Sequence, residues 1–514
     1  MDESRPEVML ADVVEASRAV AATRSRTAKT QALADLLTRC APEEVGTVVS
    51  HLSGVLPQRR LGVGFRSLRD LPEPAQTPTL TVLEVDAAFE RLASAHGTGS
   101  TASRRSELST LMSRATSVEQ QFLRDLMTGN LRQGALDGVV LAAISAAYAV
   151  PAATVRRAAM LAGTAAEVAT LAATGGHRAL EEVALVVGRP VRPMLAASAK
   201  TTGEAAESIG ESELIVDGKL DGIRVQVHRR GGEVTVYTRS LDEITDRVPE
   251  VVEAVAALPG GDLVVDGEAI VLRADGRPEP FQVTGARTAS SADLTGLQAR
   301  MPLTTFLFDV LHVGGRDLLD DSARVRHEVL LDLAPHLLVP RLLTDDPDGA
   351  EQFFADLVAA GHEGVVVKDA DSPYAAGRRG SGWVKVKPVH TLDLVVLAVE
   401  WGSGRRVGSL SNIHLGARDP ATGEFTMVGK TFKGMTDEVL AWQTKRFAEL
   451  AVDGTDGWVV PVRPVQVVEI AVDGVQRSSR YPGGVALRFA RVLRYRDDKE
   501  ADAADTIDTV RGLL

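Results

Sequence analysis

The chain has 514 residues but only one cysteine, Cys40. A single thiol excludes a disulfide framework and a cysteine-rich zinc site, and it is typical of a reducing compartment. Long apolar runs are also missing. The window at 138–155 is interrupted by Ser145 and Pro151, and the window at 392–401 is too short to span a bilayer. The first ten residues are acidic and do not resemble a signal peptide. We therefore expect a cytoplasmic protein with no membrane partner.

An excess of positive charge is absent as well. The 57 Lys and Arg residues against 69 Asp and Glu residues give a net charge of −12. This balance argues against binding of nucleic acid over the whole surface. It leaves room for local basic patches, which the sequence has at 56–69, 99–108, 401–409 and 477–496. Taken singly, each patch is more simply interpreted as a solvated face.

The length exceeds what one hydrophobic core supports and predicts about three domains. Residues 1–200 have apolar residues at helical spacing and end in a proline-containing segment at 188–196, which predicts an all-α domain followed by a linker. Strand-like runs dominate residues 201–388 and predict an α+β domain. Residues 389–514 have short strands and Gly-rich turns, which are typical of a small β-barrel.

Within these domains a few helices are predicted individually. Pro151 and the pair Gly175-Gly176 predict the start and the end of one helix. Helical stretches are also expected near 246–257, 350–360 and 436–450.

The stretch DGKLDGIRVQVHRR, at 217–230, places Lys219 two residues before Asp221-Gly222, between two alternating segments. Asp-Gly between such segments is typical of a hairpin turn, so Lys219 is predicted at a strand–turn edge where its amine can face a pocket. A lysine becomes a nucleophile only when deprotonated, and neighbouring cations or desolvation lower its pKa. Lys219 is therefore either a solvated turn residue or a nucleophile.

The later strand-like motifs supply the groups that would favour the second interpretation. They contain cations, two acids that could hold magnesium or a ribose, and a rare aromatic that could stack on a base: Arg224, Arg239, Lys368, Lys385 and Lys387; Glu268 and Glu363; Phe308. Singly, each is more simply a turn, edge-strand or core residue. Together, a lysine among cations with two acids on consecutive strands meets the needs of nucleotidyl transfer, which are positioning and neutralisation of phosphate charge.

The ordered motifs DGKLDGIR, YTRS, VVDGEAIV, FLFDVLHV, EGVVVK and GWVKVKP resemble those of the lysine nucleotidyltransferases. Four flanking segments, GRPVRPMLA, HGTGSTASRR, GNLRQGALDG and LRFARVLRYRDDK, are similar to the three-domain ATP-dependent DNA ligases and among them to the actinobacterial ligase B type. The resemblance implies a helical DNA-binding domain, a nucleotidyltransferase core and a C-terminal OB-fold. Ala490 stands where many relatives have proline, and we expect little effect from this difference.

The resemblance also implies roles around the nucleotide. Lys219 carries AMP as a phosphoramidate, Asp217 lies near the adenine, and Phe308 stacks on it. Arg224 and Arg239 approach the nucleotide phosphate or the 5′-phosphate of the nick.

Further roles follow for the remaining motif residues. Glu268 contacts the ribose or the metal, and Glu363 serves magnesium. Lys385 and Lys387 hold the α-phosphate, and the nucleotide-binding set also includes Lys368 and Arg379, with Arg378 as an alternative to Arg379. In the last domain, three cations orient the pyrophosphate leaving group: Arg488, Arg491 and Lys499. If Arg488 and Arg491 share a strand, their odd spacing places them on opposite faces.

The function implied is an ATP-dependent DNA ligase, using ATP and Mg²⁺, that seals nicks in double-stranded DNA during replication, recombination or repair. We expect a nucleoid-associated monomer that encircles DNA. A capping guanylyltransferase or an RNA ligase would share the core but lack the flanking elements, and an NAD-dependent ligase normally carries a four-cysteine zinc module. A non-catalytic DNA-binding scaffold would have no reason to keep Lys219, Glu268, Glu363 and Lys385 together.

Overall fold

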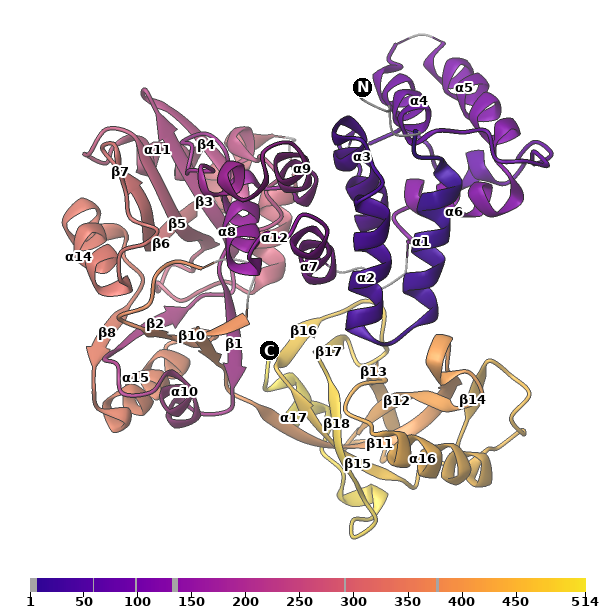
Figure 1. Ribbon diagram of the computed structural model, residues 1–514. Coiled ribbons are helices and arrows are strands. Elements are labelled where there is room, and N and C mark those ends of the chain that lie inside the picture. The colour runs from indigo at the N-terminus through magenta and orange to yellow at the C-terminus, as the bar shows by residue number, and fades with distance from the viewer. Residues whose placement is uncertain (1–6, 59, 98, 132–136, 291–292, 376–378) are drawn as a thin grey trace, which may run out of the picture.

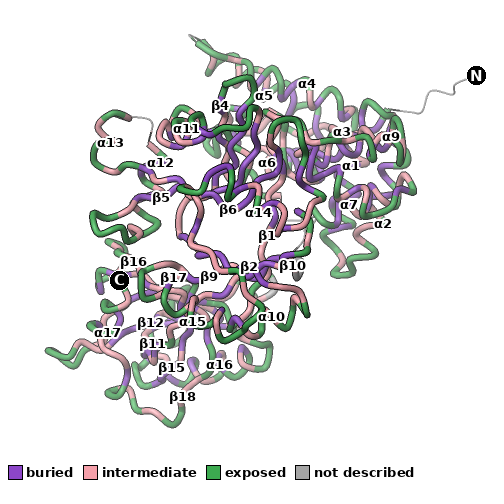
Figure 2. The backbone as a smooth tube through the Cα atoms, turned by 90° about the vertical axis from the view of Figure 1, so that its left-hand side faces the viewer, coloured by how far each residue is buried: buried purple, intermediate pink, exposed green. Residues whose placement is uncertain are grey.

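The computed structural model describes residues 7–58, 60–97, 99–131, 137–290, 293–375 and 379–514, the side chains of 379–381 and 405 excepted. Figure 1 shows three units, with helices at the upper right, a two-sheet unit at the left and a β-rich unit at the lower right. Buried residues follow the strands of the two-sheet unit and the inner helices (Figure 2). In the described part of the chain, no helix is long and apolar enough to cross a membrane.

The first unit is built from helices that share one apolar core: α1 (Leu10–Ala22), α2 (Arg26–Leu37), α3 (Pro42–Ser53), α4 (Val82–Ser94), α5 (Ser100–Arg114), α6 (Ser117–Met127), α7 (Asp137–Ala147), α8 (Ala152–Ala162) and α9 (Ala165–Glu181). Capping boxes such as Thr81 with Glu84 fix where helices begin. The prediction of a single helix from Pro151 to Gly176 is wrong. The chain forms two helices here, because α8 ends at Gly163, and α9 does not stop at Gly176 but continues through a kink there.

His51 of α3 is fully buried in this unit, against the edge of Phe89 from α4. Among the described residues neither of its ring nitrogens has a hydrogen-bond partner. Burial lowers the pKa of His51 to about 4 from 6.5. The unfolded chain therefore binds a proton that the folded chain excludes, and stability is lost as the pH falls from 6.5 towards 4, by about 3 kcal/mol in total.

We expect His51→Leu to remove this part of the acid sensitivity. Hydrogen exchange of α3 and α4, compared between the two proteins at each pH from 7 to 4.5, measures it. The wild-type helices should lose protection more steeply than those of the variant. Parallel pH profiles would show that His51 does not carry the effect.

The second unit contains two five-stranded sheets. In spatial order the first is β1 (Leu195–Ala199), β10 (Arg379–Val386), β9 (Gly364–Asp369), β2 (Leu214–Lys219) and β8 (Arg341–Thr344). The second is β4 (Glu233–Thr238), β3 (Ile223–Arg230), β5 (Leu263–Val271), β6 (Leu303–Val313) and β7 (Arg316–Asp317). Since β1 pairs with β10, this unit includes Leu195–Ala199, which the sequence-based boundary at residue 201 leaves in the helical domain.

Helices cover the outer face of each sheet. On the first sheet lie α10 (Thr202–Ile209) and α15 (Pro347–Ala359), and on the second lie α11 (Pro249–Ala256) and α14 (Ala323–Leu333). The unit also contains α12 (Phe281–Ala289) and α13 (Leu294–Arg300). Both sheets therefore turn their remaining faces towards the space between them.

The third unit begins at His390. Its main sheet, in spatial order, is β13 (Phe425–Thr431), β12 (Leu410–Arg418), β11 (His390–Trp401), β15 (Val467–Val472) and β18 (Arg491–Arg496), and β14 (Val459–Pro461) pairs with β11. A two-stranded ribbon of β16 (Gly474–Arg477) and β17 (Val485–Arg488) and the helices α16 (Asp437–Leu450) and α17 (Ile507–Arg511) complete it. Strands and helices enclose an apolar core, as expected of a small barrel.

Candidate active site

A cleft of about 2200 Å³ runs between the two sheets of the second unit, and segments of all three units line it. Alternation along the strands decides which side chains reach it. On β2, Leu214 and Val216 pack under the helices, so Asp217 and Lys219 point the other way, into the cleft. The same alternation directs into the cleft the predicted residues of the other strands: Arg224, Glu268, Phe308, Lys368 and Lys385.

Lys219 is the last residue of β2, but no hairpin follows it, because β2 and β3 lie in different sheets. The hairpin interpretation of Asp221-Gly222 is therefore wrong. The chain crosses from one sheet to the other here, and a Cβ on Gly222 would lie 2.5 Å from the carbonyl oxygen of Ala269. Only glycine allows this close approach of the crossing segment to β5, three residues after Lys219 in the lining of the cleft.

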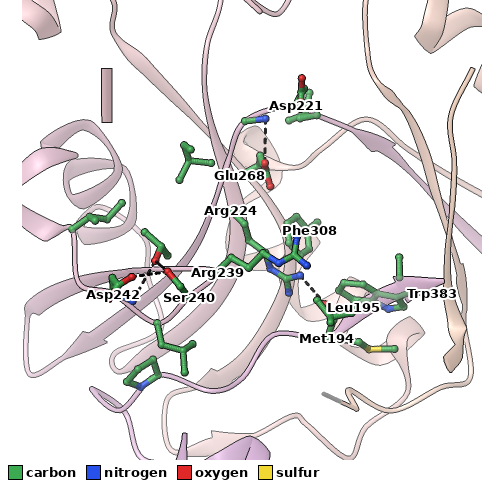
Figure 3. Close-up of a pocket in the computed structure, with 18 of the residues that line it drawn as sticks. Met194, Leu195, Asp221, Arg224, Arg239, Ser240, Asp242, Glu268, Phe308 and Trp383 are labelled. Carbon is green, nitrogen blue, oxygen red and sulfur yellow. Dashed lines mark hydrogen bonds between the residues drawn. The ribbon is translucent and has the colours of Figure 1, made fainter. Parts of the chain in front are cut away.

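Glu363 lies between two lysines at this point. Its carboxylate pairs with the amines of Lys219 and Lys387, and the Lys219 amine also donates to the carbonyl oxygen of Leu220 at 3.3 Å. The second acid, Glu268, accepts a hydrogen bond from the backbone N–H of Gly222 at 3.2 Å (Figure 3). Burial raises the pKa of Glu268 to about 7, although Lys219 and Arg224 oppose the shift.

One wall of the cleft is aromatic and rests on a buried ionic cluster. Phe308 meets Trp383 edge to face at 5.9 Å, and the Lys368 amine lies 4.3 Å from the centre of the Trp383 ring. Lys368 also pairs with Asp217 at 2.6 Å, and Arg341 donates a hydrogen bond to the same carboxylate at 2.7 Å. Although burial opposes it, the charges of Arg341 and Lys368 hold the pKa of Asp217 below its usual value.

Arg224 and Arg239 differ in how firmly they are held. Arg224 donates to the carbonyl oxygen of Met194 at 2.7 Å and to Asp266 at 2.8 Å, and Figure 3 shows it beside Phe308. Burial opposes its charge, yet Asp266 raises the pKa of Arg224 above its usual value. Arg239 is exposed in the turn after β4, beside Ser240. Arg379 starts β10, but its side chain and the whole of Arg378 lie outside the described residues.

The third unit reaches the cleft through Arg488, which pairs with Asp221 at 2.6 Å. Arg491 pairs with Asp473 at 3.1 Å, and Asp473 lies 3.9 Å from the Lys387 amine. Lys499 instead pairs with Asp393 of its own unit at 2.8 Å. The three predicted leaving-group residues are therefore not brought together in this arrangement.

Arg488 and Arg491 do not share a strand, so the argument from their odd spacing does not apply. Arg488 ends β17 and Arg491 begins β18, because the chain turns at Phe489, whose φ is 53°. Ala490 is buried at this turn, and its carbonyl oxygen accepts a hydrogen bond from Thr431.

Several cleft residues were not singled out from the sequence. Trp383 lines the cleft, Arg341 pairs with Asp217, and Asp473 lies 3.9 Å from the Lys387 amine. These contacts arise only through long-range strand pairing or docking of the third unit, which no local motif signals. Asp221 was interpreted as a turn residue, and its pairing with Arg488 could not be foreseen. Phe489 lines the cleft with 58% of its surface exposed and a positive φ, which is uncommon for an aromatic residue.

In the cleft between the two sheets Lys219 is paired with an acid that also binds a second lysine, and an aromatic wall lines the same cleft. This is the arrangement expected of the lysine nucleotidyltransferases, the class that the sequence motifs resemble. Three family models match the chain: "DNA ligase N terminus" at residues 63–145, "ATP dependent DNA ligase domain" at 193–387 and "ATP dependent DNA ligase C terminal region" at 406–499.

Relatives similar over their whole length support the same family. A probable DNA ligase of Nocardioides sp. is 59% identical over 513 residues, with 99% of both chains covered, and one of Beutenbergia cavernae is 59% identical over 514 residues, covering 98% of this chain and 99% of the relative. The solved structure Pmar-Lig_Pre. has 19% identity and a TM-score of 0.61, covers 94% of this chain and 99% of its own, and supports the fold. The chain therefore belongs to the ATP-dependent DNA ligases. The predicted family, fold class and activity are confirmed.

Proposed function

We propose that this ATP-dependent DNA ligase seals nicks through a covalent adduct on Lys219. The observation that supports the proposal is the position of the Lys219 amine, at the floor of the cleft, paired with Glu363 and flanked by Lys387. The amine attacks the α-phosphorus of ATP, an N–P bond forms, and pyrophosphate leaves. The 5′-phosphate of the nick then takes the AMP from the lysine, and attack by the 3′-hydroxyl forms the phosphodiester and releases AMP.

The proposed nucleotide site uses the groups that share the cleft. Phe308 offers a ring face to the adenine, and the buried ionic cluster of Asp217, Lys368 and Arg341 supports that wall. Lys385 and Lys387 neutralise the α-phosphate, while Arg224, Arg239 and Arg379 serve the nucleotide phosphates or the nick. Preorganised charges of this kind stabilise the charge that develops in the transition state.

Magnesium is the proposed metal, and the donor chemistry fits it. Glu268 and Glu363 are two carboxylates near the reacting amine, and the described residues hold no cluster of three or more acids, histidines or cysteines that could cage an ion by themselves. Mg²⁺ usually binds through one or two carboxylates together with substrate phosphates. When bound, the ion would neutralise phosphate charge.

Arg488, Arg491 and Lys499 are the proposed cations for the pyrophosphate. Arg488 already lies at the cleft, whereas Arg491 and Lys499 must exchange their carboxylate partners to reach it. The third unit is therefore expected to move between steps. We further propose a nucleoid-associated monomer that encircles DNA and acts in replication, recombination or repair.

Duplex DNA is the proposed partner of the helical unit, whose segment 54–58 lines the same cleft. Gly99 of the GTGS segment is the N-cap of α5, and the backbone N–H groups at a helix N-terminus favour phosphates. In the LRQG segment only Leu131 is among the described residues.

One assay tests the function. The full chain is incubated with magnesium and with α-labelled ATP, GTP or NAD, and then with a nicked DNA duplex or a nicked RNA duplex. We expect a labelled adduct with ATP only, and transfer of the label followed by sealing with nicked DNA only. Labelling by GTP or sealing of RNA would favour a capping enzyme or an RNA ligase. Absence of any adduct would favour a non-catalytic scaffold.

A further inference from the structure

The strand β3 has an unusual polar face. Val225 and Val227 pack in the apolar core, so Arg224, Gln226 and His228 share the opposite face. An alternating strand of this kind normally exposes its polar face to water. Here Gln226 and His228 are 4% and 1% exposed. What covers them is the segment 188–194, the linker between the helical unit and the two-sheet unit.

The side-chain amide of Gln226 makes all four hydrogen bonds available to it, and two of them hold the linker at Val191. Its Oε1 accepts from the backbone N–H of Val191 at 2.6 Å, and its Nε2 donates to the carbonyl oxygen of the same residue at 3.1 Å. The second N–H of Nε2 points to Asp266 at 3.3 Å, and the remaining contact of Oε1 is His228 Nε2 at 3.0 Å. A buried amide with this full set of partners has one orientation only.

His228 holds the start of the linker, which precedes Val191 in the chain. Its Nδ1 accepts from the backbone N–H of Gly188 at 3.0 Å, so the ring proton is on Nε2, which donates to Gln226. Next to Val191 the linker is also tied to the helical unit, because the backbone N–H of Arg192 donates to the carbonyl oxygen of Met160 at 2.9 Å and the Arg192 side chain pairs with Asp137 at 2.8 Å. The linker is thus bonded to both units.

From Gln226 the contacts lead to the cleft. Asp266, with no exposed surface, accepts from Gln226 on one oxygen and from Arg224 and Tyr374 on the other, at 2.8 and 2.6 Å. Arg224 in turn donates to the carbonyl oxygen of Met194, and the Tyr374 hydroxyl accepts from the N–H of Met194 at 3.0 Å. The linker therefore meets the Asp266–Arg224 pair twice, directly at Met194 and through Gln226.

We propose that Gln226 is a positioning residue for nick sealing. Its hydrogen bonds couple the position of the linker, through Asp266, to the position of the Arg224 guanidinium. The inference rests on the proposed role of Arg224 at a phosphate. The linker then has a part in the reaction, because Arg224 is held in one place when the helical unit is docked as in this structure. Misplacement of such a group by about 1 Å can cost about 10²-fold in rate.

A double-mutant cycle in the full chain tests this. Single-turnover rates of AMP-adduct formation and of sealing of a pre-adenylated nick are measured for Gln226→Met, Arg224→Ala and the double variant. Methionine keeps the volume of the side chain but offers no hydrogen bonds to Val191 or Asp266. In the step that Arg224→Ala slows, Gln226→Met should slow the wild type by about 10- to 100-fold, and the Arg224→Ala variant by less than about twofold.

Tyr374→Phe is the second variant, which carries the test if Gln226→Met does not fold, and it should show the same dependence on Arg224. Tyr237→Phe is the matched control. It removes the hydrogen bond from Tyr237 to the Gly188 carbonyl, 2.8 Å long, without touching Asp266, and should leave both rates unchanged.

Three results would overturn the inference. They are equal slowing by Gln226→Met in both backgrounds, no slowing in the wild type, and an Arg224→Ala variant with normal rates in both steps. A wild-type chain that fails to seal nicks in the same assay would instead overturn the proposed function.

Discussion

Lys219→Ala is expected to abolish formation of the AMP adduct, with a loss of about 10³-fold or more, as for other catalytic nucleophiles. The variant should still fold. The Lys219 side chain is partly exposed at the edge of β2, and after its removal Glu363 keeps its pair with Lys387. Labelled ATP and magnesium, followed by denaturing electrophoresis, measure the adduct directly.

The same variant separates the two halves of the reaction. Supplied with a nick that already carries AMP on its 5′-phosphate, Lys219→Ala should still form the phosphodiester, because the last step needs no lysine nucleophile. Lys219→Arg is the matched control, since it keeps the positive charge but cannot accept AMP under these conditions. Labelling of either variant at the wild-type level would mean that another residue is the covalent site.

Glu363→Gln should give the second largest loss, about 10²- to 10³-fold in adduct formation, the range seen when a preorganised electrostatic group is removed. The substitution leaves the amines of Lys219 and Lys387 without the carboxylate that they share, and removes one of the two acids proposed for magnesium. Single-turnover labelling at several magnesium concentrations measures the effect.

Two further variants define the cause. Glu363→Asp keeps a carboxylate and should retain more activity than Glu363→Gln at high magnesium. Glu213→Gln removes an acid that pairs with Arg324 just before β2 and outside the cleft, and should change the rate by less than about twofold. If Glu363→Gln labels within a few-fold of the wild type, the carboxylate has neither proposed role.

The sequence foretold best those features that depend on local alternation. Lys219, Glu268 and Lys385 could be placed on strands because apolar and polar residues alternate around them, and one face of each strand is buried under helices. The same logic could not say that β2 and β3 belong to different sheets. That depends on the close approach of Gly222 to β5, a contact between distant segments.

Helices and buried polar groups show where local patterns are insufficient. The sequence of α12, FQVTGARTA, contains threonine and glycine, which are poor helix formers, and the helix exists because tertiary packing supports it. On β3, Gln226 and His228 resemble a water-facing edge, because nothing in the local sequence shows that a linker 35 to 40 residues away in the chain covers them. Polar residues of this kind are identified as buried only when the fold is known.

The contacts between the third unit and the cleft have a polarity. The two-sheet unit has a negative Asp221 and a positive Lys387 at the contact. The third unit places a positive Arg488 opposite Asp221 and a negative Asp473 opposite Lys387. If the third unit docked after a half-turn, like charges would face each other at both points. The observed orientation is therefore favoured by repulsion in the reversed orientation as well as by its own attractive pairs. Partly exposed pairs contribute only about 0–1 kcal/mol each. The orientation of the docked third unit is therefore specific, although the unit can dissociate from the cleft at little cost. Raised salt should therefore loosen this docking without unfolding either unit.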